Sequence, residues 1–547
     1  MSSIDWIVLV VTLSAIIIYG VYKSRTTKNL DGYFLSNRDM PWYLVLLSIM
    51  GTQASAITFL SAPGQAYTDG MRFVQYYFGL PLAMIVICIV FVPMFNRLKV
   101  YTAYEFLENR FDLKTRTFTS FLFQVSRGLS TGISIYAPSL IISSLLGWNI
   151  YYTNIIMGGL LIIYTVSGGA KAVAHTQKMQ LIIIIGGMLI AGYLVVDLMP
   201  GNVGFTEALH IGGKSGKMNI ITSGRTTGGF DWKDKYNIWS GIIGGFFLAL
   251  SYFGTDQSQV GRYLTAQNNR QSKLGLLING LVKVPMQFLI LMLGVLVFSF
   301  YQFHKAPIYF NEPQVSRAKE SPYKDSLISL EAIYAKVPAG DVIKKNAINK
   351  EYREILSRAL PGEEINDTNF VFLRFVIDYL PRGLVGLLIA VIFLAAWGSI
   401  AAALNALASC TVVDIHKIFF RKDLTQEMDY RISKIYTLCW GIFCIAVAEF
   451  ASNLGNSLIE TVNILGSLFY GVILGIFLVA FWFRQLKANA TFYASIIAEV
   501  IVIAIYKADV ISFLWLNVIG ALLVIIFGSI LQVFIKTGNN KQPGKQE

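Results

Sequence analysis

Two stretches of small and polar residues interrupt segments that are otherwise apolar. The first covers residues 51–58 and reads GTQASAIT, and the second covers residues 395–403 and reads AAWGSIAAA. Within a membrane, such stretches indicate unwound helix, because lipid offers a peptide backbone no hydrogen bonds. Carbonyl oxygens released by unwinding, together with a hydroxyl, form an oxygen-only cage that suits an alkali cation. Small residues also let helices pack closely, and for the second stretch this interpretation stays equally open.

Charged side chains also fall within apolar segments. Lys283 stands in the run LVKVP at 281–285, and Arg127 precedes Gly132 and Tyr136. A charge at the centre of a membrane-spanning helix costs about 2.5–3.5 kcal/mol on insertion, so it indicates a functional role by default. The alternatives are a snorkelling side chain or a buried structural pair. Asp256 and the polar residues after it could form an inner gate of the transport path, or they could be charged residues that anchor the end of the seventh apolar segment.

The composition of the chain predicts that these residues lie in membrane-spanning segments. The chain has 547 residues, of which 55% are hydrophobic and 14% charged, and this balance excludes an ordinary soluble globular protein. Thirteen apolar segments are long enough to cross a hydrocarbon core of about 30 Å. They cover residues 4–22, 42–63, 73–96, 118–145, 150–167, 179–199, 238–260, 275–302, 383–415, 435–452, 458–482, 489–506 and 511–535.

The distribution of basic residues predicts the orientation of the chain. With the N-terminus outside and the C-terminus inside, the short outer connections carry Arg72 and Lys507, and the short inner ones and the tail carry many more. Basic residues gather on the cytoplasmic side of a membrane. Much of the net charge of +13 is then explained by basic residues that lie on the cytoplasmic side. We therefore expect a multi-pass protein of the cell inner (plasma) membrane. Its expected partner is the lipid bilayer, and no nucleic acid.

No constellation typical of an enzyme appears. The four cysteines and four histidines lie scattered, without the spacing of a metal site or a disulfide scaffold, and there is no P-loop. We therefore expect neither an enzyme nor an ATP-driven pump. The polar connection 303–382 is interpreted as an external cap.

Several separated motifs carry a resemblance to a known family. They are YFLSNRDMPW at 33–42, Ser55, Ala56 and Gly70, YAP at 136–138, SGGAKAV at 167–173, and LNALA at 404–408 leading to Asp414. From about residue 30 to about residue 490 the chain resembles bacterial-type members of the sodium:solute symporter family, which are sodium/glucose-cotransporter-like. The resemblance implies an all-α integral membrane protein with the inverted-repeat (5+5) LeuT-like transporter fold.

The same resemblance implies a division of the chain. Residues 1–30 form an extra N-terminal transmembrane helix, 31–200 the first inverted repeat (spans 2–6), and 201–485 the second (spans 7–11), with external loops 200–237 and 303–382. Residues 486–547 form two C-terminal transmembrane helices and a basic cytoplasmic tail.

Carried over from the family, the sodium site would take carbonyls from Gly51, Ala54 and Ala395 and a hydroxyl from Ser399. At position 398 the sugar symporters commonly have a second hydroxyl residue, and this chain has Gly398, whose region can still coordinate. A second sodium site, described in sialic-acid members, needs an acidic residue and serines where this chain has Gln177, Ala401 and Ala402. The resemblance therefore implies one sodium ion per substrate.

The resemblance also implies a substrate site. Lys283 falls where sugar symporters have a sugar-contacting lysine, and Tyr252 and Phe253 fall where they have an aromatic inner gate. The residues that bind galactose in the family are missing, since Thr58 and Tyr77 stand at two of those positions. Thr58 and Gln75 could supply other hydrogen bonds, and Tyr77 is also expected to contact the substrate.

These features favour symport of a monosaccharide or sugar derivative by alternating access. The second-span pattern SAIT at 55–58, with Pro63 beyond, also resembles the branch that carries monocarboxylates, vitamins and iodide, so a small organic anion (monocarboxylate, vitamin or sialic acid) is the alternative. Lys283 or Arg127 would then meet a carboxylate. An uncoupled sensor or carrier on the same fold is a further alternative, and the expected oligomeric state is a monomer or a loose dimer.

Overall fold

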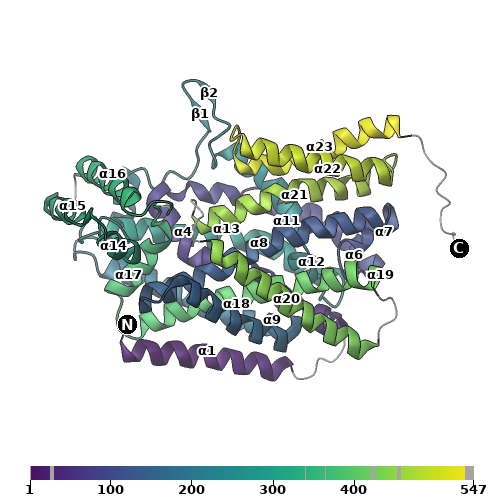
Figure 1. Ribbon diagram of the computed structural model, residues 1–547, viewed down its shortest axis with the longest axis horizontal. Helices are drawn as coiled ribbons and strands as arrows, with labels where there is room; N and C mark the ends of the chain where they lie inside the picture. The colour runs from purple at the N-terminus through teal and green to yellow at the C-terminus, as the bar shows by residue number, and fades with distance from the viewer. Residues whose placement is uncertain are drawn as a thin grey trace.

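The computed structural model describes residues 2–24, 30–338, 341–363, 365–420, 425–451 and 457–535. Its helices run roughly along the longest axis of the molecule (Figure 1), and a two-stranded sheet is the described β structure. The predicted all-α architecture is confirmed. The basic tail predicted after residue 535 lies outside the described residues. So do four of the basic residues predicted to lie in the short inner connections, namely Arg25, Lys28, Arg421 and Lys422.

The first part of the chain is helical almost throughout. In order, its elements are α1 (Ser3–Ser24), α2 (Leu30–Leu35), η1 (Ser36–Arg38), α3 (Trp42–Gln53), α4 (Ala56–Asp69), η2 (Met71–Tyr77), α5 (Leu80–Val86), η3 (Ile87–Phe91), α6 (Val92–Leu98), α7 (Glu105–Arg110), α8 (Leu113–Leu146) and α9 (Ile150–Asp197).

The second part contains a hairpin, a group of short helices and the remaining long helices. Its elements are α10 (Phe205–Lys214), β1 (Arg225–Thr226), β2 (Gly229–Phe230), η4 (Ser240–Gly244), α11 (Gly245–Gly254), α12 (Gln257–Tyr263), α13 (Asn269–Phe300), α14 (Glu312–Ala318), α15 (Lys324–Lys336), α16 (Val342–Ala359), η5 (Thr368–Phe370), α17 (Val371–Tyr379), α18 (Leu384–Cys410), η6 (Thr411–His416), α19 (Lys417–Phe419), α20 (Gln426–Phe450), α21 (Leu458–Trp482), α22 (Ala488–Lys507) and α23 (Phe513–Phe534). The two strands pair antiparallel, with Arg225 opposite Phe230.

Most of the predicted spans correspond to long apolar helices. In the described part of the chain nine helices are long and apolar enough to cross a membrane, or ten if the bent pair α3–α4 is one span. Three shorter apolar helices, Ser3–Ile16, Ile150–Val166 and Ser240–Gly254, fall on the other predicted segments. The number thirteen stays a prediction.

Helix α9 does not run straight through its 48 residues. The hydroxyl oxygens of Tyr164 and Thr176 lie 2.6 Å apart, although the two residues are 12 positions apart in the sequence. Twelve residues of straight α-helix rise about 18 Å, which is farther than these two side chains can bridge. The helix therefore folds back between Tyr164 and Thr176, and its two arms fall on two predicted segments.

Two spans are interrupted, the first near its middle and the second near the end of the predicted segment 238–260. Helix α3 ends at Gln53 and α4 begins at Ala56, with a bend of 59° between them. Helix α11 is followed by Thr255 and Asp256, whose carboxylate caps α12 by accepting a hydrogen bond from the Ser258 amide at 2.8 Å. In transporters built from inverted repeats, discontinuous helices in corresponding positions form the binding site. The two breaks therefore mark the expected position of the binding site.

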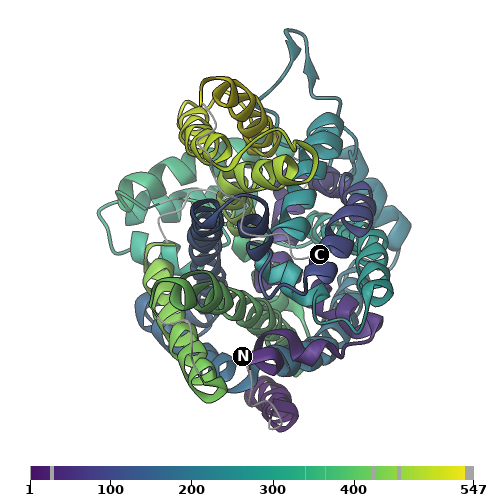
Figure 2. The same ribbon diagram turned by 90° about the vertical axis from the view of Figure 1, so that its right-hand side faces the viewer.

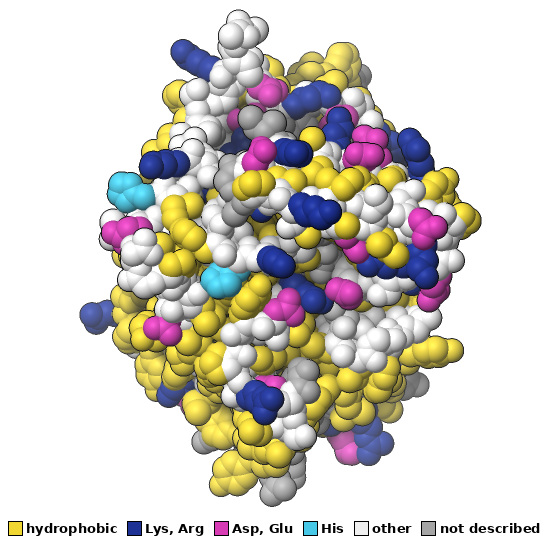
Figure 3. Space-filling model, turned by 90° about the vertical axis from the view of Figure 1, so that its left-hand side faces the viewer, with side chains coloured by type: hydrophobic (Ala, Val, Ile, Leu, Met, Phe, Trp, Pro, Cys, Tyr) yellow, Lys and Arg dark blue, Asp and Glu magenta, His cyan; other side chains and the backbone are white. Residues whose placement is uncertain are grey.

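The predicted external cap is a small folded unit. Helices α14, α15 and α16 gather at one end of the molecule (Figure 1) around their own apolar cluster, which includes Leu327 and Leu356. Seen from that end, acidic and basic side chains lie interspersed, and hydrophobic side chains gather toward the lower edge of the view (Figure 3). Viewed along the long axis, α1 lies at one edge of the helices and α22 and α23 at the opposite edge (Figure 2).

Candidate functional site

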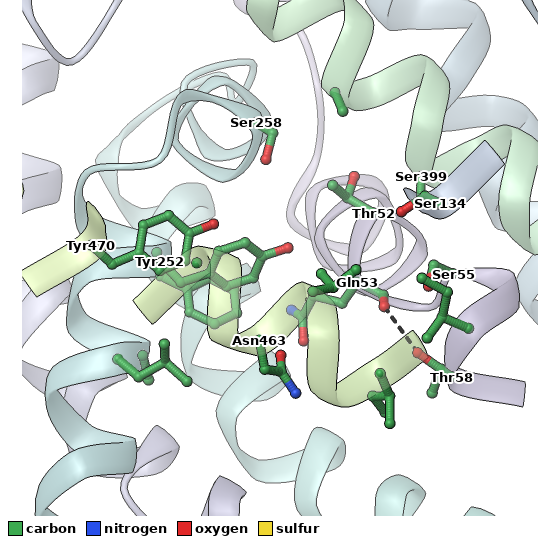
Figure 4. A pocket seen from close by; sticks show the side chains of 18 of the residues that line it. Thr52, Gln53, Ser55, Thr58, Ser134, Tyr252, Ser258, Ser399, Asn463 and Tyr470 are labelled. Atoms are coloured by element: carbon green, nitrogen blue, oxygen red, sulfur yellow. Dashed lines mark hydrogen bonds between the residues drawn. The ribbon is translucent and has the colours of Figure 1, made fainter. Parts of the chain in front are cut away.

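A cavity of about 150 Å³ lies where the two broken spans meet. Its walls come from α3, α4, η2, α5, α8, α11, α12, α13, α18 and α21. Figure 4 shows how the labelled hydroxyl and amide side chains surround it. Six residues predicted to bind substrate line the cavity, and so does the predicted sodium ligand Ser399. The six are Thr58, Tyr77, Arg127, Tyr252, Phe253 and Lys283.

The break between α3 and α4 frees the carbonyls that were predicted to bind sodium. In a continuous helix the amides of Ser55 and Thr58 would bond the carbonyls of Gly51 and Ala54. Instead, the Ser55 amide donates to Gln53 O at 2.9 Å and the Thr58 amide donates to Ser55 O at 3.0 Å. Gly51 and Ala54 are thus left with carbonyl oxygens that lack their helical donors, as a cation cage requires.

On the facing helix α18, Ser399 supplies a hydroxyl at the cavity. Its Oγ donates to the Ala396 carbonyl at 3.0 Å, so its hydrogen is engaged and its lone pairs stay available. The predicted ligands Ala395 and Gly398 lie on the same buried helix, which is continuous from Leu384 to Cys410. The unwinding predicted for residues 395–403 is therefore wrong, and the close-packing alternative describes this stretch. The Gly398 carbonyl accepts a hydrogen bond from Gln177 Nε2 at 3.0 Å.

Gln177 connects α9 with both helices that bear the predicted sodium ligands. Besides its bond to Gly398, Nε2 donates to Thr52 Oγ1 at 3.2 Å, and Oε1 accepts from Ser48 Oγ at 2.9 Å. A Cβ built on Gly51 would come within 2.8 Å of the Gln177 side chain. Glycine at position 51 therefore makes room for this glutamine.

Arg127 is part of a buried ion pair. Its guanidinium donates to the Asp256 carboxylate, and its Nη2 also donates to Tyr470 Oη at 2.7 Å. Tyr470 Oη in turn donates to Asp256 at 2.7 Å, and the Tyr252 ring lies 5.4 Å from the guanidinium carbon. The contacts of Arg127 are therefore those of a buried structural pair, which was one of the alternatives for this residue. Arg127 also lines the cavity.

Lys283 differs from Arg127 in its surroundings. The residue is only 2% exposed, and its ammonium lies 5.5 Å from the centre of the Tyr77 ring. Among the residues that the structure describes, no carboxylate forms an ion pair with it. Burying a charge is costly unless it is paired, so an anion bound beside this amino group would offset the cost of its burial.

Gln75 is the predicted substrate residue that the structure does not bring to the cavity. Its Nε2 donates to Thr222 Oγ1 at 3.1 Å and to the Tyr236 carbonyl at 3.0 Å, while its Oε1 accepts from the Thr222 amide at 3.2 Å. Nε2 also donates to the Arg72 carbonyl at 3.3 Å. The side chain thus holds the segment between β2 and α11 and the segment before β1 against η2. We assign Gln75 no direct role in binding.

Other polar residues of the cavity were not predicted as substrate ligands. Gln53, Ser134 and Asn463 also line it, and all three are labelled in Figure 4. Asn463 Oδ1 accepts from Tyr76 Oη at 3.0 Å, and its buried Nδ2 has no partner among the described residues. An asparagine near the start of an apolar segment was a weak signal in the sequence. Ser134 offered none, because serines occur along all of α8.

Comparisons with known proteins agree with this arrangement. A sequence model of the sodium:solute symporter family matches residues 33–321 and 348–498. The sodium/sialic acid symporter SiaT of Proteus mirabilis is 26% identical over 531 residues, which cover 96% of this chain and 94% of SiaT. The sodium-coupled monocarboxylate transporter 1 of Xenopus laevis is 26% identical over 475 residues, covering 86% of this chain and 66% of that transporter.

A solved structure supports the fold. That of a Na+-coupled sialic acid symporter, in a substrate-bound outward-open state, matches with a TM-score of 0.78 at 24% identity, over 98% of each chain. The inverted-repeat LeuT-like fold expected from the sequence is confirmed.

Proposed function

The chain belongs to the sodium:solute symporter family, and on this premise we propose that it imports a small solute bearing a carboxylate together with sodium. As a member of that family it is a sodium-coupled, multi-pass membrane transporter and not an enzyme. The proposal adds the class of the substrate. From sequence alone we favoured a monosaccharide or sugar derivative over an organic anion, and the cavity reverses that preference.

The charge of the cavity carries the proposal. Arg127 is neutralised by Asp256, whereas Lys283 lacks a carboxylate partner among the described residues. An anionic substrate would pair with the Lys283 ammonium in a place shielded from water, where a charge-assisted hydrogen bond is strong. A neutral sugar would leave the buried ammonium without a counter-ion. Two of the relatives are named for sialic acid and for monocarboxylates, and both kinds of substrate are carboxylates.

The remaining lining suits a substrate that also carries hydroxyl or amide groups. Thr58, Ser134 and Asn463 offer donors and acceptors around the cavity, and Tyr252 with Phe253 presents aromatic faces. A polar group left unpaired in such a site weakens binding, so these residues discriminate among carboxylates. A hydroxylated or acylated sugar acid satisfies more of them than a bare short-chain acid.

Sodium would act through the break in α3–α4. An ion held by the Gly51 and Ala54 carbonyls and by Ser399 on α18 ties the unwound segment to α18. The same segment contributes Ser55 and Thr58 to the cavity, so ion binding organises the substrate site. Substrate affinity then rises with sodium, and by linkage sodium affinity rises with substrate.

Thermal stabilisation of the purified protein tests the proposal. In potassium buffer, we expect a carboxylate-bearing solute from a panel of sugar acids, monocarboxylates and neutral sugars to raise the melting temperature only when sodium is added. Uptake of that solute into proteoliposomes should require an inward sodium gradient.

Lys283→Gln tests the role of the ammonium, and Lys273→Gln, on the same helix α13, is the matched control. We expect the first variant to lose sodium-dependent stabilisation by the carboxylate and the second to keep it. Removing a charge-assisted contact should weaken affinity by about tenfold or more. Stabilisation by a neutral sugar alone, unchanged in Lys283→Gln, would contradict the proposal.

A further inference from the structure

An apolar crevice lies on the flank of the molecule, apart from the cavity described above. It encloses about 310 Å³, mainly between α13 and the second arm of α9. None of the described residues that line it carries a charge, and Tyr193 bears the one hydroxyl among them. Neither a polar solute nor an ion would find a partner on these walls.

The crevice opens toward the hydrocarbon of the membrane. Leu189 on one wall is 61% exposed and Leu289 on the other is 49% exposed. Both belong to helices long and apolar enough to cross a membrane, Val173–Asp197 and Asn269–Phe300. The crevice is therefore continuous with the surface that contacts lipid. An empty gap in such a surface forfeits dispersion contacts, and lipid chains are the molecules that surround it.

The floor of the crevice belongs to the broken span. Phe59 lines it and is only 2% exposed. Its neighbours in the first turn of α4, Ile57 and Thr58, line the substrate cavity. A single turn of helix thus separates the crevice from the substrate cavity, and whatever fills the crevice supports that turn from behind.

A glycine keeps the crevice open. A Cβ built on Gly192 would meet only Leu293 Cδ1, at 4.0 Å, so a larger side chain at this position would extend into the space. Gly186 on the same arm of α9 likewise has no atom within 4 Å of a built Cβ, and it does not line the crevice. The two glycines offer the same substitution inside and outside the crevice.

We propose that this crevice binds one acyl chain of a bilayer lipid, which reaches the side chain of Phe59. The chain extends from the bilayer between Leu189 and Leu289 and lies against the first turn of α4. Lipid at this place differs from the lipid that merely surrounds the helices, because it contacts a residue that is buried in the protein.

Photo-crosslinking tests this proposal. The protein is reconstituted in phosphatidylcholine that carries a diazirine in the middle of one acyl chain, and the labelled peptides are identified by mass spectrometry. We expect label on the peptide that contains Phe59 as well as on those that contain Leu189 and Leu289. In Gly192→Phe the label on the Phe59 peptide should be lost, whereas Gly186→Phe should keep it.

Two results would overturn the proposal. One is label confined to the outward-facing leucines, because lipid would then surround the helices without entering. The other is a Phe59 label that persists in Gly192→Phe. Melting temperatures establish that both variants fold, and Gly192→Leu replaces the phenylalanine variant if that one does not. Transport activity does not enter this test, so its outcome is independent of the proposed substrate.

Discussion

At the scale of single residues, the site depends on which atoms are left free. The Ser399 hydroxyl donates its hydrogen to the Ala396 carbonyl, so its oxygen can act only as an acceptor at the cavity. The Gly51 and Ala54 carbonyls lack their helical donors, because the amides of Ser55 and Thr58 bond elsewhere. Oxygen atoms in this state are the ligands that a hard cation prefers. Of the predicted sodium ligands, Ser399 is the one whose oxygen a substitution can remove.

Ser399→Ala removes the hydroxyl oxygen and leaves the buried helix otherwise unchanged. We expect the sodium concentration that gives half-maximal uptake to rise by about tenfold or more, the size of loss typical for a weakened metal site. Uptake at saturating sodium should recover. Ser409→Ala is the matched control, since Ser409 is buried on the same helix and donates to the Ala406 carbonyl at 2.8 Å. An equal response in both variants would speak against a sodium-binding role.

Asp256→Asn tests the ion pair with Arg127. Removing one partner of a buried pair leaves the other charge uncompensated and costs about 3–5 kcal/mol. We therefore expect a clear fall in melting temperature for Asp256→Asn, and a smaller one for the double variant Arg127→Gln, Asp256→Asn. A double-mutant cycle measures the coupling between the two residues. Additive effects would show that the pair contributes little beyond each single side chain.

At the scale of elements, the important contacts join the broken span to its neighbours. Gln177 of α9 bonds Ser48 and Thr52 on α3 and the Gly398 carbonyl on α18. These three helices carry or surround the predicted sodium ligands. An amide that donates to one helix and accepts from another fixes the distance between them, and second-layer groups of this kind tune metal affinity.

Gln177→Leu keeps the approximate size of the side chain and removes the three hydrogen bonds. We expect sodium affinity to fall by about 10–100-fold, because the Gly51 carbonyl and Ser399 lose their fixed spacing. The ratio of lithium to sodium affinity should also change, which a simple loss of stability would not produce. Gln124→Leu is the control, since Gln124 likewise bridges two helices, through Ser120 and Thr411. Unchanged ion affinity and selectivity in Gln177→Leu would rule out this role.

At the scale of the whole molecule, the number of charges moved per cycle follows from the ions and the substrate. The sequence predicts one sodium per substrate, and the cavity favours a carboxylate. One sodium and one monovalent anion carry no net charge, so the membrane potential, worth about 2.3 kcal/mol per charge at 100 mV, does not drive uptake. A tenfold sodium gradient then supplies about 1.4 kcal/mol, enough for a tenfold accumulation.

We therefore expect uptake of the carboxylate to be electroneutral. In proteoliposomes with a fixed sodium gradient, a potential imposed by a potassium ionophore should leave initial rates unchanged. A neutral sugar carried with one sodium would instead move one charge per cycle and respond to the potential. Carboxylate uptake that accelerates with a negative interior would require more than one sodium, and would contradict the predicted stoichiometry.

Much of the fold could be predicted from the sequence, because membrane insertion acts on each segment by its own composition. Apolar length predicted the spans, and the polar run at 51–58 predicted the break between α3 and α4. The break at Thr255 and Asp256 was less clear, since Gly254 and polar residues could equally have ended a span. The hairpin within α9 became evident from a contact between Tyr164 and Thr176.

The candidate site was predicted in part. Six substrate residues and Ser399 line one cavity, because their spans are broken or carry intramembrane polar groups that the sequence displays. Gln75 was indistinguishable in sequence from a substrate ligand. Its partners Thr222 and Tyr236 lie more than a hundred residues away, and a side chain's hydrogen bonds depend on which segments become its neighbours.

Sequence alone predicts a membrane protein with an unwound span, because hydrophobicity and the need to satisfy backbone polar groups are properties of local segments. The charge of the cavity, in contrast, depends on the tertiary structure. Arg127 and Lys283 look alike as single basic residues within apolar segments. Folding places Asp256 beside Arg127 and pairs no described carboxylate with Lys283. Charges act through space, so their balance is settled only when distant helices come together.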